Sequence, residues 1–125
     1  MKTVIKNGRV ITPNATISGY LLVEDGIIKE IGEGEYAAEA DKVIDAEGCY
    51  VSPGFIDLHT HGAGGADFMD GTVEAFLDAA KMHAAHGATL VYPTTLTSSN
   101  EVLFDTFVNY EKALELNTEG SAFGG

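Results

Sequence analysis

The sequence has few basic residues, a single cysteine and no long apolar run. Only seven of its 125 residues are Lys or Arg, against 19 Asp and Glu, and the formal net charge is −12. A chain this acidic repels phosphate backbones and anionic membranes, so nucleic acid and membrane partners are not expected. A phosphorylated small molecule would need a pocket that is a local exception to this charge.

Cys49 is the only cysteine, so no disulfide can form within the chain. A single thiol fits a reducing cytoplasm, and we expect Cys49 to be a buried packing residue. The first eight residues lack the apolar core of a signal peptide. No apolar run approaches the roughly 20 residues that cross a bilayer. These absences favour a cytoplasmic globular protein, which the hydrophobic share of 45% also fits.

The first fifty residues alternate short apolar runs with turn-forming residues. Asn7-Gly8 tolerates positive φ angles and predicts a hairpin between strands at residues 3–6 and 9–12. A second hairpin is expected around Glu24-Asp25-Gly26. Its second arm supplies three candidate core residues, Ile27, Ile28 and Ile31.

A further strand is predicted at residues 43–45, after an acidic, alanine-rich segment at residues 32–41. That segment has spaced carboxylates without apolar support, so we expect a solvated loop rather than a cation site. Together these strands predict a small antiparallel sheet over residues 1–50.

The segment from Pro53 to Gly65, PGFIDLHTHGAGG, is the most informative part of the chain. Its apolar start follows Pro-Gly and predicts a buried strand at residues 55–58. Because strand side chains alternate, His59 and His61 should point to one side, about two rises of ~3.3 Å apart. Two imidazoles so placed can converge on one divalent cation. A surface pair is the alternative, but it would not need the open loop expected at Gly62, Gly64 and Gly65.

Residues 51–125 continue with alternating helix and strand signals. Thr72 is expected to cap a helix over residues 73–86. His83 and His86 lie off its apolar face, so we expect both at the surface.

A second strand is predicted at residues 89–92, and Ser98 with Glu101 forms a capping box for a helix that ends near Leu116. The hydroxyls of Thr94 and Thr95, in the loop between them, are candidate substrate contacts, because ligands gather at the carboxyl ends of such strands. Turn and capping chemistry is the alternative. Strand, helix, strand, helix is the order of an α/β fold with a parallel sheet.

The stretch from Pro53 to His61 resembles the first metal-binding strand of the amidohydrolase superfamily. The continuations GAGGADFMDG, at residues 62–71, and YPTTLTSS, at residues 92–99, are similar to the N-acetylglucosamine-6-phosphate deacetylases. The resemblance implies an α/β fold in which residues 51–125 are the first two strand-helix units of a TIM-like (β/α)₈ barrel. It also implies that residues 1–50 are half of a composite β-sandwich.

The same resemblance implies hydrolysis of an N-acetyl amide, giving glucosamine 6-phosphate and acetate. It implies one or two divalent metal ions, zinc or iron, per complete site, with His59 and His61 as ligands. The ligand would be a small amino sugar phosphate, and the complete enzyme a homodimer. Asp57, two residues before His59, is expected to orient an imidazole, with a metal ligand or a buried ion pair as alternatives.

In the resembled family a strand with His-Leu-Glu-Gly-Pro supplies a glutamate ligand. Glu119 lacks the preceding histidine and the proline, so that role is not assigned to it. The other ligands and the catalytic aspartate would follow Gly125, since a barrel needs about 250 residues. We therefore expect the 125-residue chain alone to be inactive.

Two other interpretations share these features. One is another amidohydrolase, such as a dihydroorotase or a cyclic-amide hydrolase, which has the same first strand. A lysine ligand after Gly125 would favour it, whereas a His-Leu-Glu-Gly-Pro strand would favour the deacetylase. The other is a non-catalytic metal-binding or interaction module, which would hold metal weakly through two histidines.

Overall fold

The computed structural model describes residues 1–124, in two compact units. Unit 1 comprises residues 1–53, and unit 2 begins at Gly54. Within the described residues, no helix is both long enough and apolar enough to cross a membrane.

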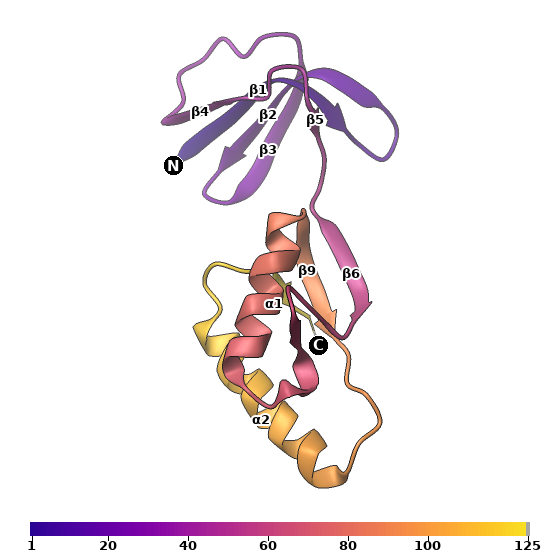
Figure 1. Cartoon of the computed structure of the whole chain (residues 1–125). Helices are drawn as coiled ribbons and strands as arrows, with labels where there is room; N and C mark the ends of the chain where they lie inside the picture. Colours follow the sequence, from indigo (N-terminus) through magenta and orange to yellow (C-terminus); the bar gives the residue numbers. More distant parts are fainter. Residues whose placement is uncertain (125) are drawn as a thin grey trace. The chain divides into compact units, whose positions relative to one another are not determined.

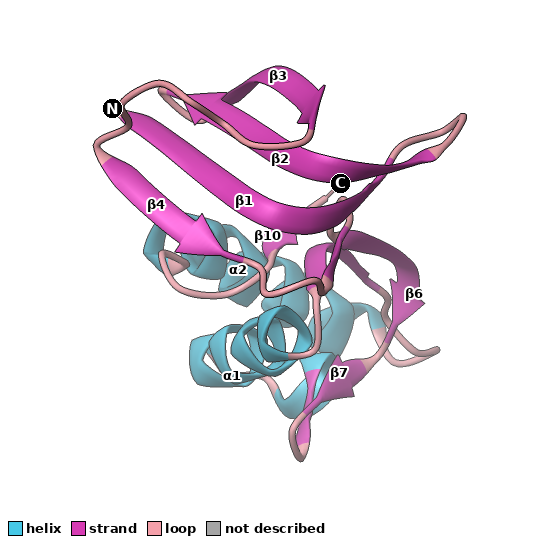
Figure 2. Ribbon diagram, turned by 90° about the horizontal axis from the view of Figure 1, so that it is seen from above, coloured by secondary structure: helices cyan, strands magenta, loops and turns pink. Residues whose placement is uncertain are grey.

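Unit 1 is a five-stranded mixed sheet (Figures 1 and 2). Its strands are β1 (Lys2–Ile11), β2 (Thr16–Glu24), β3 (Ile27–Glu33), β4 (Lys42–Asp45) and β5 (Tyr50–Val51). The order is β3-β2-β1-β4, and β5 also pairs with β1. Neighbours β1, β2 and β3 are antiparallel, but β4 and β5 run parallel to β1. The prediction of an all-antiparallel sheet was wrong, because the segment after β3 crosses the sheet to its other edge.

Asn7-Gly8 forms a bulge inside one continuous strand, so the predicted hairpin turn was wrong. Asn7 has a φ of 55°, and the register with β2 shifts between Ile5 and Gly8. The Asn7 amide donates to both carboxylate oxygens of Asp45, at 3.0 and 2.9 Å. The expected positive φ is present, but neighbours on both sides of β1 keep the strand extended through it.

The second predicted hairpin is confirmed, since Asp25 and Gly26 join β2 to β3 with φ angles of 49° and 79°. The predicted burial of its second arm is wrong. Among the described residues, β3 is an edge strand with β2 as its one partner. This leaves its isoleucines exposed by 62%, 59% and 37%, for Ile27, Ile28 and Ile31. The apolar residues that unit 1 does bury are Val4, Val10, Leu21 and Leu22.

Residues 34–41, between β3 and β4, form a loop, and the predicted loop over residues 32–41 was two residues too long because Gly32 and Glu33 belong to β3. Glu35, Glu39 and Asp41 are exposed, as expected for a loop. Cys49 is also exposed, so its predicted burial was wrong. The backbone of Cys49 is held by hydrogen bonds: its carbonyl accepts from the Arg9 N–H, and its N–H donates to the Ala46 carbonyl. The side chain takes no part in these bonds and is exposed.

Unit 2 contains a three-stranded parallel sheet of order β10-β9-β6 (Figure 1). Its larger elements are β6 (Phe55–Thr60), α1 (Val73–Ala85), β9 (Ala88–Pro93), α2 (Asn100–Leu116) and β10 (Ala122–Phe123). Between β6 and α1 lie β7 (Gly62–Ala63), β8 (Ala66–Asp67) and the 3₁₀ helix η1 (Phe68–Asp70). Helix α1 contacts both β9 and α2. The parallel strands and their helices confirm the predicted α/β class.

The core of unit 2 forms where η1, α1 and α2 meet. Phe68 and Phe76 stack with ring centroids 4.9 Å apart, and each side chain is 1% exposed. Ala79 and Ala113 are fully buried and allow the two helices to approach closely. This packing holds α1 against β9.

The helix boundaries follow local capping chemistry. Thr72 caps α1 as predicted, its hydroxyl accepting from the Ala75 N–H at 3.2 Å. Ser99, not Ser98, caps α2 by accepting from the Val102 N–H at 3.3 Å. The predicted capping box of Ser98 and Glu101 was therefore wrong, and the residue three after Ser99 is Val102, which cannot complete a box.

Strand β6 is formed but not buried. Phe55, Ile56 and Leu58 are 67%, 59% and 71% exposed. The predicted burial is wrong because β6 is an edge strand, with β9 as its sheet partner. Strand β10 was not anticipated in its short, glycine-rich segment, and it forms by pairing with β9.

Candidate metal centre

Two imidazoles lie together where β6 ends. The ring centroids of His59 and His61 are 5.0 Å apart, and their planes are at 90°. Two imidazoles that bind one zinc ion tetrahedrally at about 2.0 to 2.1 Å have ring centres about 5 Å apart. The spacing therefore fits a shared cation. His59 is exposed and His61 is half-buried.

The ring of His61 is oriented by the strand beside it. Its Nδ1 lies 2.8 Å from the carbonyl oxygen of Thr94. A carbonyl can only accept, so Nδ1 carries the proton and Nε2 carries the free lone pair. A hydrogen bond of this kind orients metal-binding histidines and fixes their tautomer.

Thr94 acts in this structure through its backbone. Its carbonyl accepts from His61, and its N–H donates to the Thr60 carbonyl at 2.8 Å. Its hydroxyl donates to the Tyr92 carbonyl at 3.2 Å. Thr95 lies instead in the lining of an apolar cavity of about 160 Å³, together with Phe76 and Tyr110. Substrate contact by either threonine stays a prediction.

The glycines after His61 form a tight hairpin rather than an open loop. Gly64 and Gly65 make the turn between β7 and β8, with φ angles of 66° and 87°. At Gly62, a Cβ would lie 2.0 Å from the carbonyl oxygen of Ala66. These positions need glycine for the hairpin itself, and their contact with substrate stays a prediction.

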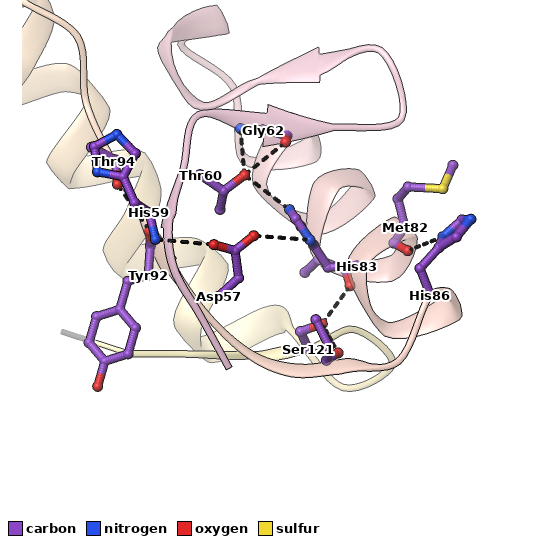
Figure 3. Close-up of polar contacts among 12 residues, drawn as sticks. Asp57, His59, Thr60, Gly62, Met82, His83, His86, Tyr92, Thr94 and Ser121 are labelled. Carbon is purple, nitrogen blue, oxygen red and sulfur yellow. Dashed lines mark hydrogen bonds and ion pairs between the residues drawn. The ribbon is translucent and has the colours of Figure 1, made fainter. Parts of the chain in front are cut away.

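Asp57 contacts the backbone of the histidine segment and a helix side chain (Figure 3). Its Oδ1 accepts from the backbone N–H of His59 at 3.1 Å. Its Oδ2 faces Nδ1 of His83, 4.0 Å away. Neither contact is to the imidazole of His59 or His61, so a role in orienting those rings stays a prediction.

His83 is not a surface residue, which corrects the sequence prediction. Its side chain is 16% exposed, and its Nε2 lies 3.2 Å from the hydroxyl of Thr60. His86 is exposed as predicted, and its Nδ1 contacts the Met82 carbonyl at 2.9 Å. The missed signal was the pair Asp57 and Thr60, since polar residues on an apolar strand need polar partners.

The two imidazoles are an incomplete ligand set. A catalytic zinc site commonly has three protein ligands and a water. Within residues 1–124, no group of three or more His, Cys, Asp or Glu side chains is placed to hold a metal ion. Glu119 is exposed and pairs with Lys81 at 3.3 Å, away from the histidines. The donors present fit part of a divalent-cation site.

Sequence comparison places this arrangement among known proteins. The family profile described as "Amidohydrolase family" matches residues 42–115. The dihydroorotase of Trichlorobacter lovleyi is 48% identical over 63 residues, which are 49% of this chain and 15% of that protein. The D-hydantoinase of Geobacillus stearothermophilus is 39% identical over 110 residues, 82% of this chain and 21% of that protein. The chain thus spans 15% and 21% of the length of these two curated relatives.

Solved structures show a similar fold. The N-acetylglucosamine-6-phosphate deacetylase from Pasteurella multocida matches with a TM-score of 0.85 and 27% identity, covering 100% of this chain and 34% of that one. A D-hydantoinase matches with a TM-score of 0.57 and 35% identity, covering 91% of this chain and 24% of that one. The likeness confirms the predicted fold class, the first strand-helix units of a TIM-like barrel after a small sheet.

Proposed function

Because this chain belongs to the amidohydrolase family, we propose that it is the N-terminal part of a metal-dependent N-acetylglucosamine-6-phosphate deacetylase. The observation that carries the metal site is the histidine pair, with ring centroids 5.0 Å apart and Nδ1 of His61 tied to the Thr94 carbonyl. The choice of deacetylase is supported by the structural likeness over the whole chain and by the segments at residues 62–71 and 92–99.

A hydrolase of cyclic amides is the second candidate. The higher sequence identities to a dihydroorotase and a D-hydantoinase favour it. Both candidates cleave an amide C–N bond by adding water, so the same histidine pair would hold the metal ion in either. They differ in the substrate of the complete site, which is an N-acetyl amide for the deacetylase and a cyclic amide for the other candidate.

The amidohydrolase family is generally dependent on a divalent metal ion, which polarises the amide carbonyl and lowers the pKa of its water toward about 7. In this chain, His59 and His61 would hold the ion through ring nitrogens. The Thr94 carbonyl accepts from Nδ1–H of His61, which in the neutral ring leaves the lone pair on Nε2, and Asp57 accepts from the His59 backbone N–H. We place the proton-carrying carboxylate and the remaining ligands after Gly125.

Metal binding by the 125-residue chain tests the site. Titration with Co²⁺, followed by its visible spectrum, should show weak binding by the wild-type chain and none by the His59→Asn/His61→Asn variant. His86→Ala is the matched control, since that exposed imidazole hydrogen-bonds to the Met82 carbonyl of its own helix. Equal binding by the double variant would refute the site.

Activity and downstream sequence test the rest. The metal-loaded 125-residue chain should not release acetate from N-acetylglucosamine 6-phosphate, because it lacks ligands and a proton carrier. Measurable turnover would contradict this expectation. A His-Leu-Glu-Gly-Pro strand encoded after Gly125 would support the deacetylase, whereas a lysine ligand would support the cyclic-amide hydrolase.

A further inference from the structure

His83 joins helix α1 to the segment that carries both histidines. Its Nε2 lies 3.2 Å from the hydroxyl of Thr60, the residue between His59 and His61. Its Nδ1 faces the carboxylate of Asp57 at 4.0 Å, and that carboxylate accepts from the His59 N–H. One helix side chain thus faces the Asp57 carboxylate, which accepts from the His59 N–H, and the hydroxyl of the residue between the two histidines, as Figure 3 shows.

The hydroxyl of Thr60 links this contact to the turn after His61. It donates to the Gly62 carbonyl at 3.0 Å and lies 3.4 Å from the Gly62 N–H. A hydroxyl has one proton, so with that proton on the Gly62 carbonyl, the contact with His83 uses Nε2–H as the donor. The chain of contacts runs from α1 through Thr60 to both sides of His61.

We propose that His83 is a positioning residue for the metal-binding pair, an inference that rests on the metal site proposed above. Helix α1 is held in the core by Phe76, Ala79 and Ala80, each 1% exposed or less. Strand β6 is an edge strand with exposed apolar residues, so its own packing restrains it weakly. Through its contacts with Thr60 and Asp57, His83 ties the backbone between the two imidazoles to the well-packed helix α1 and so restrains it.

The test uses the 125-residue chain and compares two histidines of one helix. His83→Ala removes both contacts, and His86→Ala removes an exposed ring that lies away from them, beside Met82 (Figure 3). We expect His83→Ala to weaken Co²⁺ binding about tenfold, as losing an outer partner of a metal ligand commonly does. His86→Ala should bind like the wild type.

A second readout needs no metal. In ¹⁵N NMR of the metal-free chain, the His61 ring should show the Nδ1–H tautomer set by the Thr94 carbonyl. His83→Ala should broaden or shift the His59 and His61 ring signals, whereas His86→Ala should leave them unchanged. His83→Gln, which keeps a donor for Thr60, should restore the signals in part.

Three outcomes decide the proposal. Weaker Co²⁺ binding by His83→Ala, together with broadened or shifted His59 and His61 ring signals and wild-type behaviour of His86→Ala, supports it. Wild-type affinity together with wild-type ring signals in His83→Ala overturns it, even if the variant is less stable. If the wild-type chain binds no Co²⁺, the proposed metal site fails, and the ring signals alone then decide whether His83 orders the segment.

Discussion

The two units of the chain bury apolar side chains by different means. Unit 1 relies on strand pairing, and it buries Val4 and Leu22 while the isoleucines of its edge strand stay exposed. Unit 2 relies on helix packing, which encloses Phe68 and Phe76 almost completely. An apolar pattern thus identifies residues that can be buried, and the neighbouring elements decide which of them are.

The largest effect is expected in the helical core. Phe76→Ala removes a ring that is 1% exposed and should lower the free energy of unfolding by about 3 to 5 kcal/mol. Urea denaturation, followed by the amide NMR signals of unit 2, measures it. Phe104→Ala, at a 66% exposed site of α2, is the control and should stay within about 0.5 kcal/mol. Equal losses would mean that the described core does not stabilise the unit.

A smaller effect is expected from crowding the sheet of unit 1. A Cβ at Gly19 would lie 1.9 Å from the Gly32 carbonyl oxygen, so Gly19→Ala must push β2 and β3 apart. We expect the free energy of unfolding of unit 1 to fall by about 1 to 3 kcal/mol, measured by urea denaturation followed through the amide NMR signals of that unit. Ser18→Ala, an exposed neighbour on β2, should be nearly neutral. A neutral Gly19→Ala would contradict the close approach of the strands.

A single buried hydroxyl is expected to matter less. Ser121 is 2% exposed, and its Oγ donates to the Ala88 carbonyl at 2.7 Å. Ser121→Ala should cost about 1 kcal/mol and increase hydrogen exchange at β10. The exposed Ser98→Ala is its control. Unchanged exchange at Ala122 and Phe123 would show that β10 does not depend on this bond.

The smallest effect concerns an exposed carboxylate of unit 1. Hydrogen bonds from the Glu47 N–H and the Asn7 amide hold the pKa of Asp45 below its ordinary value. The folded state therefore binds this proton less readily, and its stabilising contribution is present above about pH 4 and lost as the pH falls further. Asp45→Asn should flatten the loss of unit 1 stability between pH 5 and pH 2, measured by urea denaturation. Identical pH slopes would refute this.

Much of the fold could be predicted because its signals are local. The hydroxyl of Thr72 caps α1 by accepting a hydrogen bond from a residue three positions later. The positive φ angles of Asp25 and Gly26 are enough to reverse the chain between β2 and β3. The same chemistry at Asn7-Gly8 produced a bulge, because strands pair on both sides of β1. Strand β10 was missed for a related reason, since its partner β9 is remote in sequence.

The candidate site divides in the same way. The spacing of His59 and His61 along one strand predicted a pair, and their rings lie 5.0 Å apart. The contact of His61 with Thr94 and that of His83 with Thr60 join residues 33 and 23 positions apart. No local pattern specifies such contacts, because they depend on the register of β6 with β9 and on the rotation of α1.

By itself, the sequence determined the strand, helix, strand, helix order of β6, α1, β9 and α2, the Thr72 cap of α1, one hairpin and the two histidines at the end of β6, because each depends on neighbouring residues. Only the tertiary structure decided which apolar residues are covered, which way β4 runs and how His83 reaches Thr60. Those features depend on pairing and packing between distant segments, where the geometry of the partner sets the outcome.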